Sequence, residues 1–93
     1  MLEKTQQQTQ EPDLFNVILL NDDYTTMEFV IQVLESVFGK GPAEAFKIMM
    51  QVHTQGQGLC GVYPWEIAES KVATVHELAS SSGFPLRAGL EKA

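Results

Sequence analysis

FNVILLNDDYTT, residues 15–26, is an apolar run that changes abruptly into polar residues. Residues 15–20 are apolar and partly β-branched over the length of one strand, which predicts a β-strand. The Asn-Asp-Asp segment at residues 21–23 has the composition of a turn, and Thr25 followed by Glu28 fits a capping box that begins a helix. This stretch therefore predicts a strand, a turn and the start of a helix in immediate succession.

The rest of the chain continues with alternating helical and strand patterns. Apolar residues recur at helical spacing in three segments, and Gly or Pro stands at the boundaries between segments. The predicted elements after the first strand are helix 27–38, helix 42–53, strand 59–63, helix 64–79 and strand 85–90. The order βααβαβ predicts an α+β domain, a two-layer sandwich in which a three-stranded antiparallel sheet packs on three helices.

Length and charge limit the function. A chain of 93 residues forms one domain. Twelve acidic against six basic residues give a net charge of −6, which disfavours nucleic acid and anionic membranes as partners. The same charge favours a cationic ligand or a basic partner surface. We therefore expect neither nucleic-acid nor membrane binding.

Cysteine usage and the N-terminal segment indicate the compartment. Cys60 is the only cysteine, so no intramolecular disulfide can form, as is usual in a reducing compartment. No apolar run approaches the roughly 20 residues that span a bilayer. Residues 1–11 are mostly polar and lack the apolar region of a secretory signal. We expect a disordered tail at 1–14, a core domain at 15–93, and a cytoplasmic monomer.

The acidic turn is the first candidate site. Asn and Asp are common turn residues, and acidic groups near a helix N-terminus interact favourably with the helix dipole, so the turn can be purely structural. If Thr25 caps the helix, however, Asp22 and Asp23 retain acceptor capacity for a cation or an ammonium group. His53, near the end of the second helix, is either a boundary residue of the core or a polar group beside an apolar pocket. Both alternatives remain open for each residue.

The sequence gives weaker support to an enzymatic function. Asp22, Asp23 and His53 would be the ligands of a small metal-dependent hydrolase, but their spacing matches no known metal signature. Cys60 lies in a predicted apolar strand, where a thiol is usually buried and inert. Methionines at positions 27, 49 and 50 are typical of core packing, and also of pockets that accept several apolar shapes. We predict a binding module with no enzymatic activity, no metal and no cofactor.

Several segments together resemble one known family. VILLNDDYTTMEFV at 17–30 resembles the opening motif of ClpS, the bacterial adaptor of the Clp protease. The similarity continues, in order, through residues 45–53, 58–63, 67–72, 85–86 and 90–93. It covers nearly the whole chain after residue 14.

The resemblance implies an adaptor that recognises N-degrons. Such proteins bind substrates whose N-terminal residue is Leu, Phe, Tyr or Trp, and deliver them to the AAA+ unfoldase ClpA, which feeds the ClpP peptidase. The residues at the family's α-amino-group positions are Asn21, Asp22, Asp23 and His53. Those at its side-chain pocket are Leu19, Thr25, Met27, Val30, Met49, Val52 and Leu86. Glu66 and Lys71 correspond to its docking surface for the unfoldase N-domain, and the N-terminal tail to the extension needed for delivery.

One position departs from the family pattern. Members commonly have proline after the threonine of the Asp-Asp-Tyr-Thr motif, and this chain has Thr26 there. Proline would fix φ at this position and stiffen the loop before Met27, whereas Thr26 leaves φ free and the loop looser. Thr26 can also replace Thr25 as the helix cap, which would move the helix start by one residue. The order of preference among Leu, Phe, Tyr and Trp is therefore not predicted.

Overall fold

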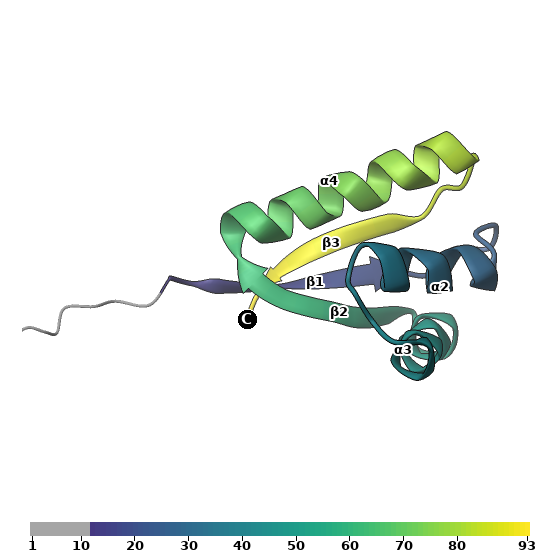
Figure 1. Ribbon diagram of the computed structural model, residues 1–93, viewed down its shortest axis with the longest axis horizontal. Helices are drawn as coiled ribbons and strands as arrows, with labels where there is room; N and C mark the ends of the chain where they lie inside the picture. Colours follow the sequence, from purple (N-terminus) through teal and green to yellow (C-terminus); the bar gives the residue numbers. More distant parts are fainter. Residues whose placement is uncertain (1–11) are drawn as a thin grey trace, which may run out of the picture.

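The computed structural model describes residues 12–93, and its elements follow the predicted order (Figure 1). They are β1 (Leu14–Leu20), α2 (Met27–Ser36), α3 (Pro42–Gln55), β2 (Gln57–Pro64), α4 (Trp65–Ser82) and β3 (Arg87–Lys92). The predicted α+β class and the order βααβαβ are confirmed.

Several predicted boundaries shift by one to three residues, and the starts of β1 and β3 are two examples. The first strand begins at Leu14, inside the segment predicted as a tail, and residues 1–11 of that segment lie outside the described part of the chain. The last strand begins at Arg87 instead of Pro85. Proline has no N–H to donate to a strand ladder, and the first residue of β3 paired with β1 is Arg87, opposite Leu20.

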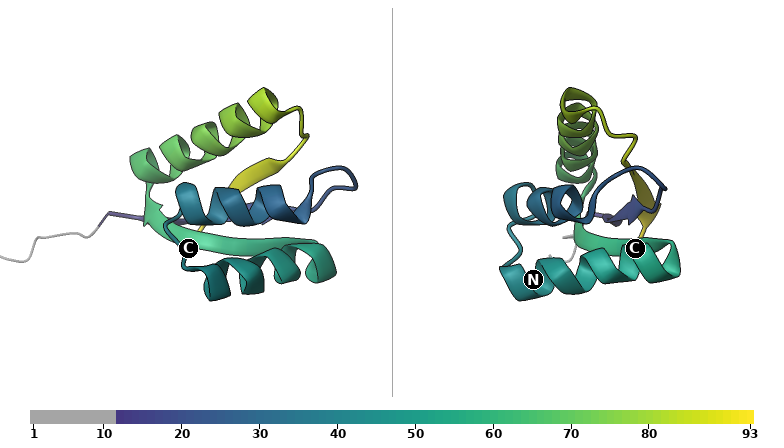
Figure 2. Two further views of the ribbon diagram at one scale, coloured as in Figure 1. Left: turned by 45° about the vertical axis from the view of Figure 1, so that its right-hand side comes forward. Right: turned by 90° about the vertical axis from the view of Figure 1, so that its right-hand side faces the viewer.

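β1 is the central strand of an antiparallel sheet with the order β2-β1-β3. Figures 1 and 2 show the three helices on one side of this sheet. The sheet is one layer of the domain and the helices are the other. Val17 and Leu19 lie on the helix side of β1 and are fully buried, whereas Leu20 is partly exposed. Because alternate side chains of a strand point to opposite faces, this pattern places the core between the sheet and the helices.

The core is apolar throughout the described residues. No charged or polar side chain between residues 12 and 93 is buried, so each polar group of a candidate site must lie at the surface or at its edge. Each helix contributes one buried face, with Val33 and Leu34 from α2, Ile48 and Met49 from α3, and Val75 from α4. Of the helices within residues 12–93, none is both long enough and apolar enough to cross a membrane.

The ends of β1 and α3 are tied together. α3 ends at Gln55 and is capped by Gly56, which adopts a left-handed conformation with φ of 91°. The Gly56 carbonyl accepts a hydrogen bond of 2.9 Å from the Asn21 amide. This bond places the last turn of α3 beside the residues that follow β1. His53 lies in that last turn, so the two polar segments predicted separately from sequence become neighbours.

Two side chains of α4 link it to other elements. Lys71 donates a hydrogen bond of 2.7 Å to the carbonyl of Val37, the residue that caps the C-terminus of α2. His76 accepts, through Nε2, a hydrogen bond of 3.0 Å from the Ala88 amide. β3 is an edge strand, so His76 satisfies an N–H group that has no neighbouring strand on that side. Both residues therefore have structural contacts.

Candidate functional site

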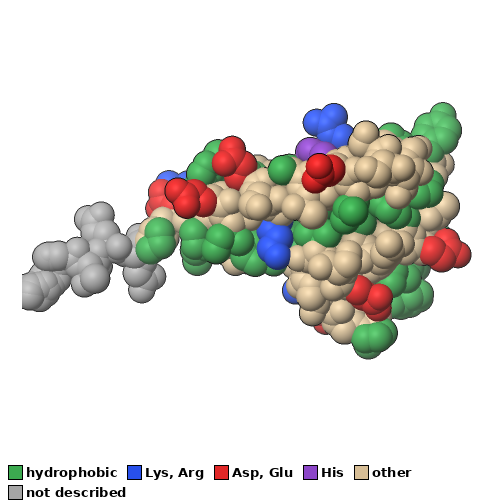
Figure 3. All heavy atoms as spheres, turned by 45° about the horizontal axis from the view of Figure 1, so that its top comes forward, with side chains coloured by type: hydrophobic (Ala, Val, Ile, Leu, Met, Phe, Trp, Pro, Cys, Tyr) green, Lys and Arg blue, Asp and Glu red, His purple; other side chains and the backbone are tan. Residues whose placement is uncertain are grey.

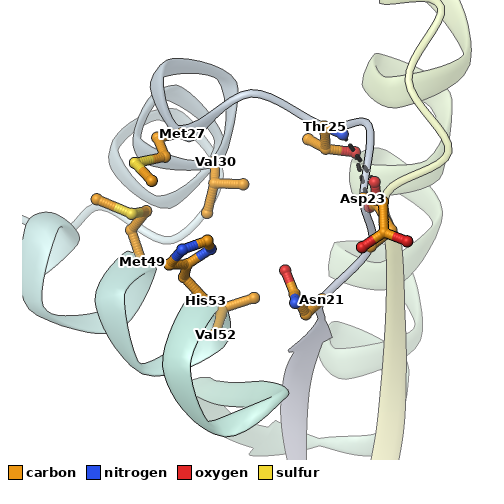
Figure 4. A pocket seen from close by; sticks show the side chains of 9 residues that line it. Asn21, Asp23, Thr25, Met27, Val30, Met49, Val52 and His53 are labelled. Atoms are coloured by element: carbon orange, nitrogen blue, oxygen red, sulfur yellow. Dashed lines mark hydrogen bonds between the residues drawn. The ribbon is translucent and has the colours of Figure 1, made fainter.

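A cavity of ≈ 210 Å³ opens where β1 ends, between α2 and α3. Figure 4 shows side chains from the loop after β1 on one side of it and side chains from the two helices on the other. Its polar lining residues are Asn21, Asp22, Asp23, Thr25 and His53, and its apolar lining residues are Met27, Val30, Met49 and Val52. The cavity thus joins hydrogen-bonding groups to an apolar surface.

Asn21 and His53 lie on opposite sides of the cavity. The backbone bond between Asn21 and Gly56 fixes the start of the loop, and both side chains are exposed to solvent. Figure 4 shows the amide of Asn21 and the ring of His53 both directed toward the space between them. A small polar group bound there is within reach of hydrogen-bonding groups from two elements.

The two adjacent aspartates have different surroundings. Asp22 Oδ1 accepts hydrogen bonds from the Tyr24 amide at 2.8 Å and the Thr25 amide at 2.7 Å, and Oδ2 accepts one from the Thr25 hydroxyl at 2.7 Å. Partial burial by itself raises the pKa of Asp22, but the bonds from Thr25 and Tyr24 outweigh it and leave that pKa below 3.8. Within residues 12–93, the carboxylate of Asp23 accepts no hydrogen bond, and it is exposed.

The prediction that Thr25 caps the first helix is wrong. Its hydroxyl donates to Asp22, and the cap is Thr26, whose Oγ1 accepts a hydrogen bond of 3.1 Å from the Phe29 amide. Thr26 has φ of −73°, which lies within the range that a proline ring imposes. The backbone at this position therefore has a φ that proline can also adopt, and the hydroxyl adds a cap that proline cannot provide.

The apolar side of the cavity comes from facing positions of α2 and α3. Val30, Met49 and Val52 are buried and form its floor. Met27, the first residue of α2, is 45% exposed, and Figure 4 shows it on the helix side of the opening. The thioethers of Met27 and Met49 are flexible and polarisable, so this surface can adjust to apolar groups of different shape.

Two residues assigned to the pocket by resemblance do not line this cavity. Leu19 is 0% exposed and Leu86 is 2% exposed, and both belong to the hydrophobic core cluster. They support the surrounding structure from within the core. Their direct contact with a ligand stays a prediction.

Gly58 is a residue whose role the sequence analysis did not identify. It lies on β2 opposite Leu19, and a Cβ added there would be 2.8 Å from Val52 Cγ2 and 3.1 Å from the Ile48 carbonyl oxygen. The absence of a side chain lets α3 lie close against the sheet behind the cavity floor. A glycine inside a strand often marks such a close approach, but the predicted strand began at residue 59, so the sequence did not reveal this role.

The hydrolase hypothesis is not supported. Within the described residues, no three side chains of His, Cys, Asp or Glu come close enough to hold a metal ion. Of the residues proposed as ligands, Asp22 already binds its own loop. Burial raises the pKa of the Cys60 thiol to about 12, which leaves it protonated and unreactive at neutral pH.

Glu66 and Lys71 lie together in a second depression. A groove of ≈ 690 Å³ runs between α2 and α4, and both residues line it, with Ile67 and Leu78 among its apolar members. Figure 3, with α4 turned toward the viewer, shows hydrophobic side chains exposed among scattered charged groups on this side of the molecule. The groove is separate from the cavity, since the two share no lining residue.

The fold and the site define a small α+β domain with a surface pocket that has hydrogen-bonding groups above an apolar floor. The family model of the ATP-dependent Clp protease adaptor protein ClpS matches residues 10–89 of this chain. The chain belongs to the ClpS family, and its members are adaptors, not enzymes.

Individual relatives agree with this assignment. The ClpS adaptor of Wolinella succinogenes is 55% identical over 82 residues, which cover 88% of this chain and 80% of the relative. That of Desulfatibacillum aliphaticivorans is 50% identical over 91 residues, 98% of this chain and 88% of the relative. The solved structure of Agrobacterium tumefaciens ClpS2 bound to L-phenylalaninamide superimposes with a TM-score of 0.86 at 38% identity, covering 89% of this chain and 100% of that chain.

Proposed function

We propose that this adaptor selects proteins by their N-terminal residue, binding N-degrons that begin with Leu, Phe, Tyr or Trp, and delivers them to a ClpA-type AAA+ unfoldase. The observation that carries the proposal is the cavity at the end of β1, which places acceptors beside an apolar floor. A protein N-terminus presents the matching pair, because its ammonium group lies two bonds from the first side chain.

The size of the cavity favours a single side chain. Pockets for drug-sized ligands have volumes of about 300–1,000 Å³, and this cavity has ≈ 210 Å³. Burying one Leu or Phe side chain contributes about 1.5–3 kcal/mol. Since Val30, Met49 and Val52 offer no polar group there, a charged first side chain would lose its hydration without compensation.

The polar side favours a positively charged α-amino group. The exposed carboxylate of Asp23, the amide oxygen of Asn21 and a ring nitrogen of His53 are acceptors around one opening. A hydrogen bond to a charged group contributes about 1.5–3 kcal/mol. Two or three such bonds and the buried side chain offset the cost of association and give an affinity on the order of micromolar.

The ligand of the related structure supports this chemistry. L-phenylalaninamide, bound to Agrobacterium tumefaciens ClpS2, carries a free α-amino group and a phenylalanine side chain. It therefore represents the first residue of a peptide, with its amide in place of the next peptide bond. The same pair of groups fits the two sides of the cavity in this chain.

A peptide titration tests the proposal. A labelled peptide that begins with Phe is titrated with the protein by fluorescence anisotropy, beside its N-acetylated form and a peptide that begins with Asp. We expect binding of the first peptide alone, because acetylation removes the charge and Asp brings an unpaired carboxylate to the apolar floor. Equal affinity for the free and acetylated peptides would refute the proposal.

Variants on each side of the opening locate the site. Asp23→Ala and His53→Ala should each weaken binding of the Phe peptide, with thermal melts unchanged because both side chains are exposed. Glu44→Ala is the matched control, since it removes an exposed carboxylate at the other end of α3. A loss of affinity in the control equal to that in Asp23→Ala would show that only net charge matters.

Delivery requires a second surface, and the groove between α2 and α4 supports this part of the proposal. The groove is apolar in part and carries charges of both signs from Glu66 and Lys71. The groove shares no lining residue with the cavity. A single adaptor molecule, which we propose to be a cytoplasmic monomer, would therefore hold a peptide and the unfoldase N-domain at the same time. Lys71 also caps α2, which makes Glu66 the better residue to change.

Calorimetry with the isolated N-domain of a ClpA-type unfoldase tests the delivery surface. Glu66→Lys should weaken N-domain binding and leave Phe-peptide binding intact. Glu77→Lys is the matched control, because Glu77 is exposed on the same helix but does not line the groove. If both variants bind the N-domain as the unchanged protein does, the groove is not the docking surface.

A further inference from the structure

The loop between β1 and α2 uses its two aspartates differently. The Asp22 carboxylate accepts three hydrogen bonds from the loop itself, at 2.7–2.8 Å. Asp23, the next residue, is exposed and accepts none within the described chain. Both border the cavity, but only one carboxylate is available to a ligand in full.

The acceptor capacity of Asp22 is nearly used. An ionised carboxylate has two oxygens with about four lone-pair sites, and it cannot donate. Oδ1 receives the amides of Tyr24 and Thr25, and Oδ2 receives the Thr25 hydroxyl. A substrate ammonium group approaching Asp22 would have to share Oδ2 with that hydroxyl or displace one of these bonds.

The bonds of Asp22 fix the direction of the chain on both sides of Asp23. They join residue 22 to residues 24 and 25, so the intervening residue is held at the tip of a closed turn. Closing the turn through a carboxylate gives charge-assisted bonds, which are shorter and stronger than neutral ones. The turn therefore sets where the Asp23 carboxylate stands relative to Asn21 and His53.

The same bonds determine where α2 begins. The Thr25 hydroxyl is turned toward Asp22 and donates to it, and the Thr26 hydroxyl is the one that accepts from the Phe29 amide. α2 then starts at Met27, which places that side chain beside the cavity opening. Asp22 thus connects the polar and the apolar sides of the site through one short segment.

We propose that Asp22 is a positioning residue, which holds Asp23 and the start of α2 in place, while Asn21, Asp23 and His53 make the direct contacts to the substrate ammonium group. The inference rests on the proposed function for the identity of the ligand. It separates two neighbouring aspartates that the family resemblance assigns to the same role.

Two substitutions of Asp22 distinguish positioning from direct charge recognition. Asp22→Ala removes the three hydrogen bonds that the Asp22 carboxylate accepts. Asp22→Asn keeps an oxygen for the Tyr24 and Thr25 amides and removes the negative charge. We expect Asp22→Ala to weaken binding of a Phe-first peptide by at least about tenfold, the equivalent of one charge-assisted bond. Asp22→Asn should recover binding to within about threefold, since a surface charge acts weakly beyond contact distance.

Asp23→Asn is the matched comparison, because the same chemical change is made one residue away. It should lose about tenfold or more in affinity, since the ion pair between the carboxylate and the substrate ammonium group is reduced to a hydrogen bond with a neutral acceptor. If Asp22→Asn is as weak as Asp23→Asn, the charge of Asp22 contacts the ligand and the proposal is wrong. If Asp22→Ala binds as the unchanged protein does, the turn has no positioning role and the proposal is equally wrong.

Nuclear magnetic resonance gives a readout that a general loss of structure would not produce. In the free protein, the amide protons of Tyr24 and Thr25 should titrate together with the Asp22 carboxyl carbon as pH falls. Addition of the Phe-first peptide at neutral pH should move the carboxyl carbon resonance of Asp23 and leave that of Asp22 nearly unchanged. The opposite pattern would overturn the assignment.

The two proposals fail in different experiments. If the unchanged protein does not prefer a free over an acetylated N-terminus, the proposed function is lost. The titration of the Tyr24 and Thr25 amides uses no peptide, so it still tests whether Asp22 closes the turn. If the peptide binds as proposed but these amides do not follow Asp22, only the positioning role is refuted.

Discussion

The substitution Gly58→Ala tests how closely α3 must approach the sheet. Gly58 is buried on β2 with α3 directly above it. Its new Cβ would lie 2.8 Å from Val52 Cγ2, 3.1 Å from the Ile48 carbonyl oxygen and 3.2 Å from Ile48 Cγ2. Val52 is β-branched and stiff at χ1, and the carbonyl belongs to the helix backbone, so neither contact relaxes by a simple side-chain rotation.

The change in unfolding free energy caused by Gly58→Ala is the sum of two opposing effects. Overpacking a core by one methyl group costs about 1–3 kcal/mol, whereas replacing Gly with Ala recovers about 0.4–1 kcal/mol through the unfolded state. We expect a net destabilisation of about 1–2 kcal/mol, which lowers Tm by roughly 4–16 °C for a domain of this size. Either α3 moves away from the sheet or Val52 moves into the cavity.

Binding should change with stability, because Val52 lines the cavity. Losing the burial of about one methylene group of the ligand weakens binding by about 0.8 kcal/mol, or about fourfold. The larger side chains should lose most, so peptides beginning with Trp or Phe should be affected more than one beginning with Leu. Anisotropy titrations with three peptides that differ only in the first residue measure this.

Gly89→Ala is the matched control. Gly89 lies on β3, and a Cβ there would be 3.7 Å from Ile18 Cγ1, an ordinary contact distance. This variant should keep its Tm within a few degrees and bind all three peptides as before. If Gly58→Ala also melts like the unchanged protein and binds Trp, Phe and Leu peptides unaltered, the close approach of α3 does not shape the pocket.

Three further predictions concern single groups. The lowered pKa of Asp22 means that the unfolded state binds its proton first as pH falls. The contribution of Asp22 to stability is therefore present at pH values above 3.8, the ordinary pKa of the group, and is lost progressively as pH falls below that value. Urea unfolding of the unchanged protein and Asp22→Asn between about pH 2 and pH 5 should show a steeper pH dependence in the former, and equal slopes would contradict this. Cys60, buried with its pKa raised to about 12, should react with iodoacetamide at neutral pH only after unfolding; rapid labelling of the folded protein would show the thiol to be accessible. Thr26→Ala should destabilise the protein by about 0.5–2 kcal/mol through loss of the cap. Thr26→Pro should recover about 0.4–1 kcal/mol of that, because the native φ of −73° already suits proline. A Thr26→Pro variant less stable than Thr26→Ala would show that the loop cannot accept the ring.

The element order was predictable because its signals are local. The apolar run before Asn21 and the helical spacing after Met27 extend over single elements, and the structure confirms both. The helix cap was assigned one residue too early, although Thr25 and Glu28 have the spacing of a capping box. That spacing carries no information on the Asp22 carboxylate, which takes the Thr25 hydroxyl and leaves the cap to Thr26.

The composition of the site was likewise predictable in part. An acidic turn, a histidine and methionines at helical spacing indicated an acceptor-rich group and an adaptable apolar surface, each with a structural alternative. What sequence periodicity could not decide was whether they meet. The hydrogen bond from Asn21 to Gly56 brings the end of α3 to the end of β1, and it joins segments far apart in the chain.

The order of elements, the acidic character and the kinds of side chain near the first turn can be read from the sequence, because these depend on neighbouring residues. The tertiary structure alone decided that Asn21 and His53 face one cavity, that Leu19 and Leu86 lie in the core, and that Gly58 lets α3 approach the sheet. It also decided which of two identical neighbouring carboxylates accepts no hydrogen bond within residues 12–93. Asp22 and Asp23 have the same chemistry, and they differ only because the fold turns the donors of Tyr24 and Thr25 toward Asp22.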